Sequence, residues 1–296
     1  YNENCGLSSD RATAVTDEQL ASGEVAYLLN SDQSAIKWYQ NIDKGEKDNA
    51  PTLSSEHYRV YKGDNIYTND LDKHSHVYKN GICTYCEYGV EEPQLVGEYY
   101  EIGNYGNLIW FQRYVDAGNV NINAKLTSDI VANENLLDSS GNVQGTPKYN
   151  WTPIGRGYSN SSDSYNGVFD GTGYSISGLY SNGTENYCGF FGKMNKGTIK
   201  NLSIVDSYFG KSSCYFVGSF VGYGHSYSNI ENCYSNATIV GWYYCGGIAG
   251  ETKGTVSNCL YNGKIKSTRN SNAIATDYKS YGKLTNCYYN ENCGLS

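Results

Sequence analysis

A short phrase recurs four times in the last third of the chain, and this periodicity restricts the possible folds more than any other feature of the sequence. The four segments are 197–209, 228–240, 254–266 and 282–290. One asparagine holds the same place in each segment, at intervals of 26 to 31 residues: Asn201, Asn232, Asn258 and Asn286. An aliphatic residue lies two places before each: Ile199, Ile230, Val256 and Leu284. Repeats of this length are typical of solenoids, propellers and other stacked arrays.

A second, glycine-rich phrase lies between these segments. It appears as YCGFFG at 187–192, FVGSFVG at 216–222 and YCGGIAG at 244–250. The runs between the glycines alternate in polarity, and no helical pattern separates them. Coils of this size stack as a parallel β-helix, in which equivalent strands of neighbouring coils pair at about 4.8 Å, and the connection should be right-handed. We therefore predict a mainly β chain in which residues 95–296 form a right-handed parallel β-helix (β-solenoid).

The cysteines follow the same periodicity. Three of the ten directly follow the recurring asparagine: Cys233, Cys259 and Cys287. In the second phrase, Cys188 and Cys245 share their place with Val217, which indicates an inward-facing apolar position. We expect most of these residues to be reduced thiols in the core. Disulfides between neighbouring coils remain the alternative, because equivalent Cα atoms lie within bridging distance.

The two phrases together resemble the GLUG repeat of bacterial surface proteins. Upstream, WTPIG at 151–155, YNGVFDGTGYSISGLY at 165–180 and LIWFQRYVDAGNVNINAKLTSDI at 108–130 resemble the stretch that precedes the first GLUG coil. The resemblance covers residues 95–290. It implies a β-solenoid and an extracellular setting, in a family found in adhesin-like proteins and beside peptidases such as the IgA-cleaving ones. It implies no catalytic residue.

A much longer repeat links the two ends of the chain. Residues 1–8 read YNENCGLS, and residues 289–296 read YNENCGLS again. This identity predicts a parent sequence with a period of 288 residues, and adjacent copies of the same module as neighbours. Tandem copying multiplies reach and valency, which favours a structural or adhesive module over an enzyme.

The part of the chain before the repeats carries different signals. Thr16 and Gln19 form a capping box, which predicts a helix start, and Leu20, Val25, Leu28 and Leu29 would form the apolar face of that helix. A second helix is predicted over residues 108–117, with Gly118 as its stop and three apolar residues on one face: Leu108, Phe111 and Val115. We expect an N-terminal α+β capping segment over residues 1–60, and a hairpin with a linker over residues 61–94.

The sequence HSHVYKNGICTYC holds the strongest candidate metal site. Its donors are two imidazoles and two thiols: His74, His76, Cys83 and Cys86. Asn80-Gly81 between them is the preferred two-residue turn of a β-hairpin, and this turn would bring the donors together. Two histidines and two cysteines complete a tetrahedral structural zinc site. The pattern also resembles short zinc knuckles of secreted bacterial proteins. A Cys83–Cys86 disulfide, or a surface histidine without a metal, is the alternative.

Aromatic residues are the other candidate for function. A ring recurs at one position of three coils, and further rings lie nearby: Tyr187, Phe216, Trp242, Tyr243 and Tyr244. Exposed rings at one solenoid position bind sugars or a protein partner. The strand preference of aromatic residues favours the other interpretation, in which alternate rings pack inward and fill the coil.

Enzyme chemistry has little support in the sequence. The acids of the coil region do not align from coil to coil, so the carboxylate pair of a β-helix polysaccharide lyase or glycoside hydrolase is not visible. None of the four histidines lies in a nucleophile-elbow context. We identify no catalytic residue and expect a non-enzymatic protein.

Charge and hydrophobicity limit the classes of partner that this chain can bind. The net charge is −8, and no basic cluster exceeds two residues, which argues against nucleic acid. No apolar run is long enough for membrane insertion. We expect a secreted adhesin-like module of a large cell-surface protein, which binds a host or neighbour-cell glycan or protein. The alternatives are a polysaccharide-cleaving enzyme and a passive structural stalk.

Overall fold

The computed structural model describes residues 13–30, 36–62, 67–70, 76, 78–84, 89–155, 164–182, 186–267, 269–276 and 282–294. The chain divides into two compact units, Tyr1–Glu91 and Glu92–Ser296. The three-part division expected from the sequence stays a prediction. Each unit is described by itself below. Among the described residues, no helix has the length and apolar character needed to cross a lipid bilayer.

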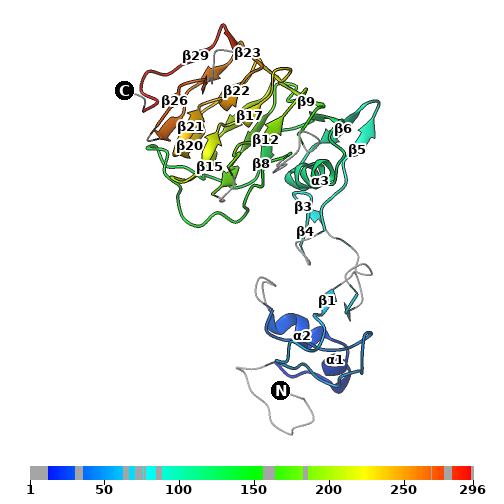
Figure 1. Cartoon of the computed structure of the whole chain (residues 1–296). Coiled ribbons are helices and arrows are strands. Elements are labelled where there is room, and N and C mark those ends of the chain that lie inside the picture. Colours follow the sequence, from blue (N-terminus) through cyan, green and yellow to red (C-terminus); the bar gives the residue numbers. More distant parts are fainter. Residues whose placement is uncertain are drawn as a thin grey trace. The chain divides into compact units, whose positions relative to one another are not determined.

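The second unit is a β-solenoid of about six turns, as the repeats predict. Figure 1 shows its strands stacked coil upon coil, from green to red along the chain. The largest sheet has eight strands: β5 (Gln94–Val96), β6 (Tyr99–Ile102), β7 (Asn123–Leu126), β9 (Val168–Asp170), β13 (Thr198–Lys200), β18 (Asn229–Glu231), β23 (Thr255–Ser257) and β28 (Lys283–Thr285). Every pairing in it is parallel except that of β5 with β6.

Four smaller parallel sheets complete the coils. One contains β8 (Ile130–Val131), β10 (Ser175–Ser177), β14 (Ser203–Val205), β19 (Tyr234–Ser235), β24 (Leu260–Tyr261) and β29 (Tyr288–Tyr289). The next two contain β11 (Tyr180–Ser181), β15 (Tyr208–Gly210), β20 (Thr238–Gly241) and β25 (Lys264–Ser267), and β12 (Phe191–Met194), β17 (Val221–Gly224), β22 (Ala249–Thr252) and β27 (Ala275–Thr276). The last contains β16 (Tyr215–Val217), β21 (Tyr243–Gly246) and β26 (Ser271–Asn272).

The recurring asparagines form a ladder along the solenoid, in the single column that the sequence predicts. Each has a positive φ between 52° and 55°, a left-handed conformation that asparagine tolerates better than most residues. The Nδ2 groups of Asn232, Asn258 and Asn286 each donate to the Oδ1 of the asparagine one coil earlier, at 3.2, 3.1 and 2.7 Å. Asn201 donates to Asp170 at 3.0 Å. The asparagine therefore serves both the bend between two strands and the contact between coils.

Replacing Asn258 by glycine should separate these two roles. Glycine keeps the left-handed bend but removes two ladder bonds, so we expect the free energy of unfolding to fall by about 1 kcal/mol. Asn258→Ala adds the strain of a Cβ at this φ and should cost about 1 kcal/mol more. Urea denaturation followed by tryptophan fluorescence measures both. Equal losses in the two variants would contradict the conformational role.

The thiols lie where the repeats predict. The seven cysteines of the solenoid are unbridged, and all but Cys287 are buried. Cys233, Cys259 and Cys287 occupy one column, and each donates to a backbone carbonyl two residues earlier in its own coil, at 3.2 to 3.3 Å. Burial raises the pKa of Cys233 well above its usual value, so this thiol stays protonated and packs as a small apolar side chain.

A helix lies against the first coils. Helix α3 (Tyr105–Asp116) buries Leu108, Phe111 and Val115, the face predicted from the sequence. It begins three residues earlier than predicted because the side chain of Asn104 accepts the N–H of Asn107 and caps its N-terminus. Phe111 meets Phe169 at 5.8 Å between ring centroids, which joins the helix to the solenoid core.

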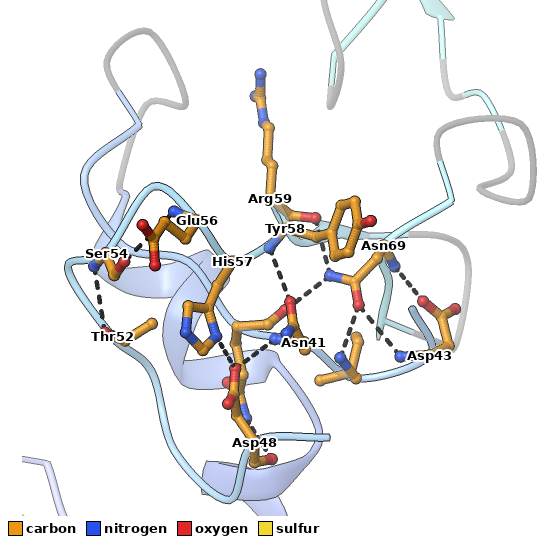
Figure 2. Close-up of polar contacts among 12 residues, drawn as sticks. Asn41, Asp43, Asp48, Thr52, Ser54, Glu56, His57, Tyr58, Arg59 and Asn69 are labelled. Atoms are coloured by element: carbon orange, nitrogen blue, oxygen red, sulfur yellow. Dashed lines mark hydrogen bonds and ion pairs between the residues drawn. The ribbon is translucent and has the colours of Figure 1, made fainter. Parts of the chain in front are cut away.

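The first unit is small and rich in polar contacts. It contains α1 (Asp17–Ala21), α2 (Glu24–Leu29), β1 (Tyr61–Lys62), β2 (Tyr67–Thr68), β3 (Tyr78–Lys79) and β4 (Ile82–Cys83). The buried Asn69 side chain accepts the N–H groups of Ile42 and Asp43, and donates to the carbonyls of Gln40 and Arg59 (Figure 2). One amide therefore satisfies four backbone groups from two loops, which holds this unit together with little apolar core.

The helical region of this unit differs from the sequence prediction. The capping box of Thr16 and Gln19 is present, but the helix breaks at Gly23, whose φ is 92°. A side chain at Gly23 would clash with Ile42 and Val60, whose side chains pack against this bend. The predicted apolar face is wrong at Leu28 and Leu29, which are 60% and 48% exposed.

Candidate functional site

The recurring aromatic residues form a stacked column on the outside of the solenoid. Tyr187 stacks on Phe216 with 5.1 Å between ring centroids and 14° between planes, and Phe216 stacks on Tyr244 at 4.9 Å and 6°. All three rings are half-buried. The rings therefore follow the coil repeat but do not fill the interior, where Val217 and Cys245 lie.

The backbone at this column is strained. Phe216 and Tyr244 have φ values of 53° and 54°, a left-handed conformation that bulky residues rarely adopt. In the next coil the corresponding residue is Asn270, with a φ of 44°, which fits the conformation better. Two coils thus keep an aromatic ring where asparagine would be less strained. Such strain clusters at functional sites.

A second set of rings lies beside the column. Tyr215 and Tyr243 pair across β16 and β21, and their ring centroids are 6.5 Å apart. Trp242 meets Tyr215 edge to face at 5.1 Å, and Tyr243 meets Tyr244 in the same way at 4.5 Å. Trp242 is 39% exposed and offers apolar surface to solvent. The structure therefore brings together all five aromatic residues that the sequence singles out.

Tyr223, which the sequence reasoning missed, joins the cluster from another strand. It lies on β17 and meets Tyr187 at 6.2 Å and Phe216 at 5.9 Å, both nearly edge to face. The sequence holds one signal for it: Tyr223 directly follows Gly222, the last residue of the glycine-rich phrase at 216–222. We call these seven rings the aromatic corner: Tyr187, Tyr215, Phe216, Tyr223, Trp242, Tyr243 and Tyr244.

Basic side chains border the aromatic corner. Lys193 Nζ lies 4.1 Å from the ring centroid of Tyr187, and Lys253 Nζ lies 5.6 Å from that of Tyr223. His225 contacts Tyr223 edge to face at 4.9 Å. Burial lowers the pKa of His225, and the charges of Lys253 and Lys193 lower it further. The imidazole is therefore neutral at physiological pH, and the two lysines carry the positive charge of this border.

The geometry limits what the aromatic corner can bind. Within the column Tyr187, Phe216 and Tyr244 stack on one another and Lys193 Nζ lies over the ring of Tyr187, so these contacts occupy ring faces and leave ring edges and hydroxyls for a ligand. Burial raises the pKa of Tyr187, which keeps its hydroxyl protonated as a donor. Ring edges and hydroxyls attract oxygen atoms, and Trp242 adds an apolar surface. This combination suits an oxygen-rich partner with apolar patches.

The outer face of the eight-stranded sheet carries charges of alternating sign. In register from coil to coil lie Glu101, Lys125, Asp170, Lys200 and Glu231. Lys125 pairs with Glu101 at 2.9 Å and Lys200 with Asp170 at 3.3 Å. Burial raises the pKa of Asp170, but hydrogen bonds from Thr172 and Asn201 and the charge of Lys200 lower it overall. Asp170 is therefore ionised and paired with Lys200.

His57 and Asp48, in the first unit, form a close acid–histidine pair. His57 Nδ1 lies 2.7 Å from Asp48 Oδ2, which also accepts the N–H of Asn41 at 2.7 Å (Figure 2). Burial raises the pKa of Asp48, but these two contacts lower it overall. Within the described part of the chain, no hydroxyl or thiol is hydrogen-bonded to Nε2 of His57. The pair therefore lacks the nucleophile of a triad and acts as a loop anchor.

Only part of the predicted zinc site can be located, because His74 and Cys86 lie outside the described residues. Asn80 and Gly81 form the turn between β3 and β4, with φ values of 51° and 71°. Cys83 is buried and unbridged on β4, and the His76 ring stacks on Tyr78 at 5.6 Å. Among the residues that are described, no three His, Cys, Asp or Glu side chains form a metal-sized group. The zinc site stays a prediction.

Elemental analysis of protein purified without chelator tests this site. We expect about one zinc per chain, because two imidazoles and two thiolates form a closed tetrahedral set. The paired substitution Cys83→Ser and Cys86→Ser should remove the metal and leave the solenoid thiols unchanged. Less than a few tenths of a zinc per chain, or a Cys83–Cys86 disulfide found by mass mapping, would contradict the prediction.

Comparison with known proteins supports the repeat assignment. The family model described as "The GLUG motif" matches residues 214–240, which run from the residue before β16 to the third residue of β20. A search of curated proteins finds no match. One similar crystal structure is a "putative immunoglobulin A1 protease from Bacteroides ovatus", with 18% identity and a TM-score of 0.44, covering 65% of this chain and 75% of that one. The fold and the motif together define a GLUG-motif β-solenoid domain.

Proposed function

We propose that this chain is a non-enzymatic adhesion module of a bacterial cell-surface protein, which binds a host or neighbour-cell glycan or protein through the aromatic corner. The observation that carries this proposal is the strained backbone at Phe216 and Tyr244, which holds stacked rings on the outside of the coil. If these rings had no role on the surface, the backbone strain would be lower with an inward-pointing ring or with asparagine at the same positions.

The setting of the rings supports the same proposal. Seven aromatic side chains gather on neighbouring strands of a protein with a net charge of −8, bordered by Lys193 and Lys253. Tyrosine, tryptophan and phenylalanine are enriched in binding surfaces. The repeat of residues 1–8 at 289–296 adds valency, because adjacent copies of the module would each present one aromatic corner.

The alternating charges argue against a polysaccharide-cleaving enzyme. Asp170 and Glu231 occupy one column, but Lys200 lies between them and pairs with Asp170. A glycoside hydrolase needs one carboxyl group with a raised pKa and a second, ionised one across the substrate. Asp170 has a lowered pKa, which suits an ion pair rather than a general acid. A passive stalk would require neither the strained rings nor their basic border.

A glycan and mucin array, run beside a reducing-end assay on the same polysaccharides, tests the proposal. We expect binding without released sugar. Released reducing ends would favour the enzyme. No binding and no released sugar, with host-cell extracts included, would favour the stalk.

Matched variants locate the binding surface. Trp242→Ala should weaken the array signal at least about tenfold, in the range expected for a central aromatic residue. Tyr174→Ala is the control, because Tyr174 is also 39% exposed but lies outside the aromatic corner. Equal losses in the two variants would refute a role for the aromatic corner.

A further inference from the structure

A long insertion forms a second feature on the outside of the solenoid. After β8 the chain leaves the regular coils, and residues 133–147, all of them described, form no strand of a sheet; we call this part the strap. The carboxylate of Asp206 accepts the N–H groups of Leu136 and Leu137, both at 2.8 Å. Long ordered loops without secondary structure usually serve a function.

Two further contacts hold the strap at Gly141 and Asn142. Thr238 Oγ1 donates to the carbonyl of Gly141 at 2.8 Å, and Lys266 Nζ donates to Asn142 Oδ1 at 2.7 Å. Gly141 has a φ of 73°, and a side chain there would collide with Thr238. The strap is therefore held at Leu136 and Leu137 by Asp206, which follows β14, and at Gly141 and Asn142 by β20 and β25, so its contacts span three coils.

A cavity of about 330 Å³ lies between the strap and the solenoid. This volume lies at the lower end of the range for small-molecule sites. The polar side chains that line it come from both walls: Asp138 and Ser139 from the strap, and Asp206, Asn236, Asn262 and Lys264 from the coils.

Two amides of the solenoid wall are held in fixed orientations. Asn236 Oδ1 accepts the N–H of Asp206 at 2.8 Å, and Asn262 Oδ1 accepts from Asn290 Nδ2 at 2.7 Å. Each carbonyl oxygen accepts a bond from the protein, which orients the amide, and the Nδ2 groups are the hydrogen-bond donors of these two lining residues.

The strap contributes an acceptor. The carboxylate of Asp138 accepts the N–H groups of Asn142 and Ser140 and the side-chain amide of Asn142. These bonds, led by the one from the Asn142 backbone, lower the pKa of Asp138, so it is ionised at neutral pH. A carboxylate has about four acceptor positions, and these contacts leave capacity for a ligand hydroxyl.

The lining selects a chemical class. Two carboxylates, Asp138 and Asp206, line the cavity with Lys264, and Lys266, which holds the strap at Asn142, adds a second cation whose charge acts on Asp138, so the charges nearly balance and favour neither an anion nor a cation. An apolar ligand would cover the remaining acceptor positions of the carboxylates and the Nδ2 groups of the amides without bonding to them, which is costly. A neutral ligand with neighbouring hydroxyls matches both the carboxylates and the amides, because a hydroxyl donates to a carboxylate and accepts from an amide.

We propose that this cavity is a binding site for a neutral monosaccharide residue. One hydroxyl donates to Asp138, and its neighbours accept from the amides of Asn236 and Asn262. The site is separate from the aromatic corner and depends on none of its residues.

Saturation-transfer NMR of the full chain with glucose, galactose, mannose and N-acetylglucosamine tests this proposal. We expect millimolar binding of at least one of these sugars. Asn262→Leu removes a lining amide and should weaken binding at least about tenfold. Asn229→Leu is the matched control, because Asn229 is exposed on β18 and does not line the cavity. Binding should survive in this control.

A second variant guards against effects on the fold. Ser139→Trp places a large ring in the cavity from an exposed strap position and should abolish binding without changing the solenoid. Absence of transfer to all four sugars would overturn the proposal. Binding that persists in Ser139→Trp, or that is lost equally in Asn262→Leu and Asn229→Leu, would overturn it as well. Loss in Trp242→Ala alone would place the sugar at the aromatic corner and not in this cavity.

Discussion

Replacing Phe169 by alanine is expected to lower the free energy of unfolding of the solenoid by about 3–5 kcal/mol, the usual cost of deleting a fully buried phenylalanine ring. Phe169 lies on β9, with no exposed surface. Its ring contacts Phe111 of α3 at 5.8 Å, Phe190 at 5.0 Å and Phe191 at 5.9 Å. The substitution would leave a cavity where the helix meets the first coils, and close-packed neighbours refill such a cavity only partly.

Urea denaturation of the full chain, followed by tryptophan fluorescence, measures this loss, because Trp110, Trp151 and Trp242 all report on the second unit. Phe169→Leu keeps most of the volume and should cost less than about 1.5 kcal/mol. Tyr227→Ala, at a side chain that is 71% exposed, should stay within about 0.5 kcal/mol of the original chain. A loss below that of Phe169→Leu would mean that the helix does not depend on this ring.

The parts of the fold that the sequence predicts are those in which each coil needs the same residue for the same local reason. Asn201, Asn232, Asn258 and Asn286 recur because every coil makes the same left-handed bend, and asparagine tolerates it while also bonding along the axis. The inward column from Phe169 through Ile199 to Ile230 recurs because every coil buries one apolar side chain at this register. Repetition turns a weak local preference into a clear pattern.

The aromatic corner is only partly visible in the sequence. The recurrence of Tyr187, Phe216 and Tyr244 predicts a column, but strand preferences give no hint that Phe216 and Tyr244 adopt positive φ and point outward. Tyr223 escapes notice because its counterparts in neighbouring coils are Lys193 and Glu251, which share its place but not its chemistry. A site built from unlike residues at equivalent positions leaves no repeat to detect.

Non-local contacts explain what the sequence does not predict at all. The strap follows no repeat, and its position depends on Asp206, which follows Leu136 by 70 residues in the chain. The helical break at Gly23 depends on Ile42 and Val60, which occupy the space where a side chain would lie. In both cases the deciding partner is distant in sequence, so local propensity carries no information about it.

The closing glycines of the second phrase have a steric cause that the repeat alone does not reveal. In each coil the strand that carries the aromatic column and the strand that follows it approach backbone to backbone. A Cβ added to Gly222 would lie 2.7 Å from the carbonyl oxygen of Phe216 and 2.8 Å from the backbone nitrogen of Cys188. Gly222 itself does not have a positive φ, so space and not conformation excludes a side chain here.

Replacing Gly250 by alanine should therefore destabilise the solenoid by at least about 3 kcal/mol, the upper end for overpacking, because the obstructing atoms are all backbone. The added Cβ would lie 2.5 Å from the carbonyl carbon of Phe216 and 2.6 Å from Val217 N and Gly222 O, and none of these can rotate away. Urea denaturation measures the loss. Gly145→Ala is the control: Gly145 has a φ of 61° with open space around it, so only the strain of about 1 kcal/mol applies. A smaller loss at Gly250 than at Gly145 would show that the strands separate easily. In that case the backbone contact could not be what holds Phe216 and Tyr244 in their strained conformation.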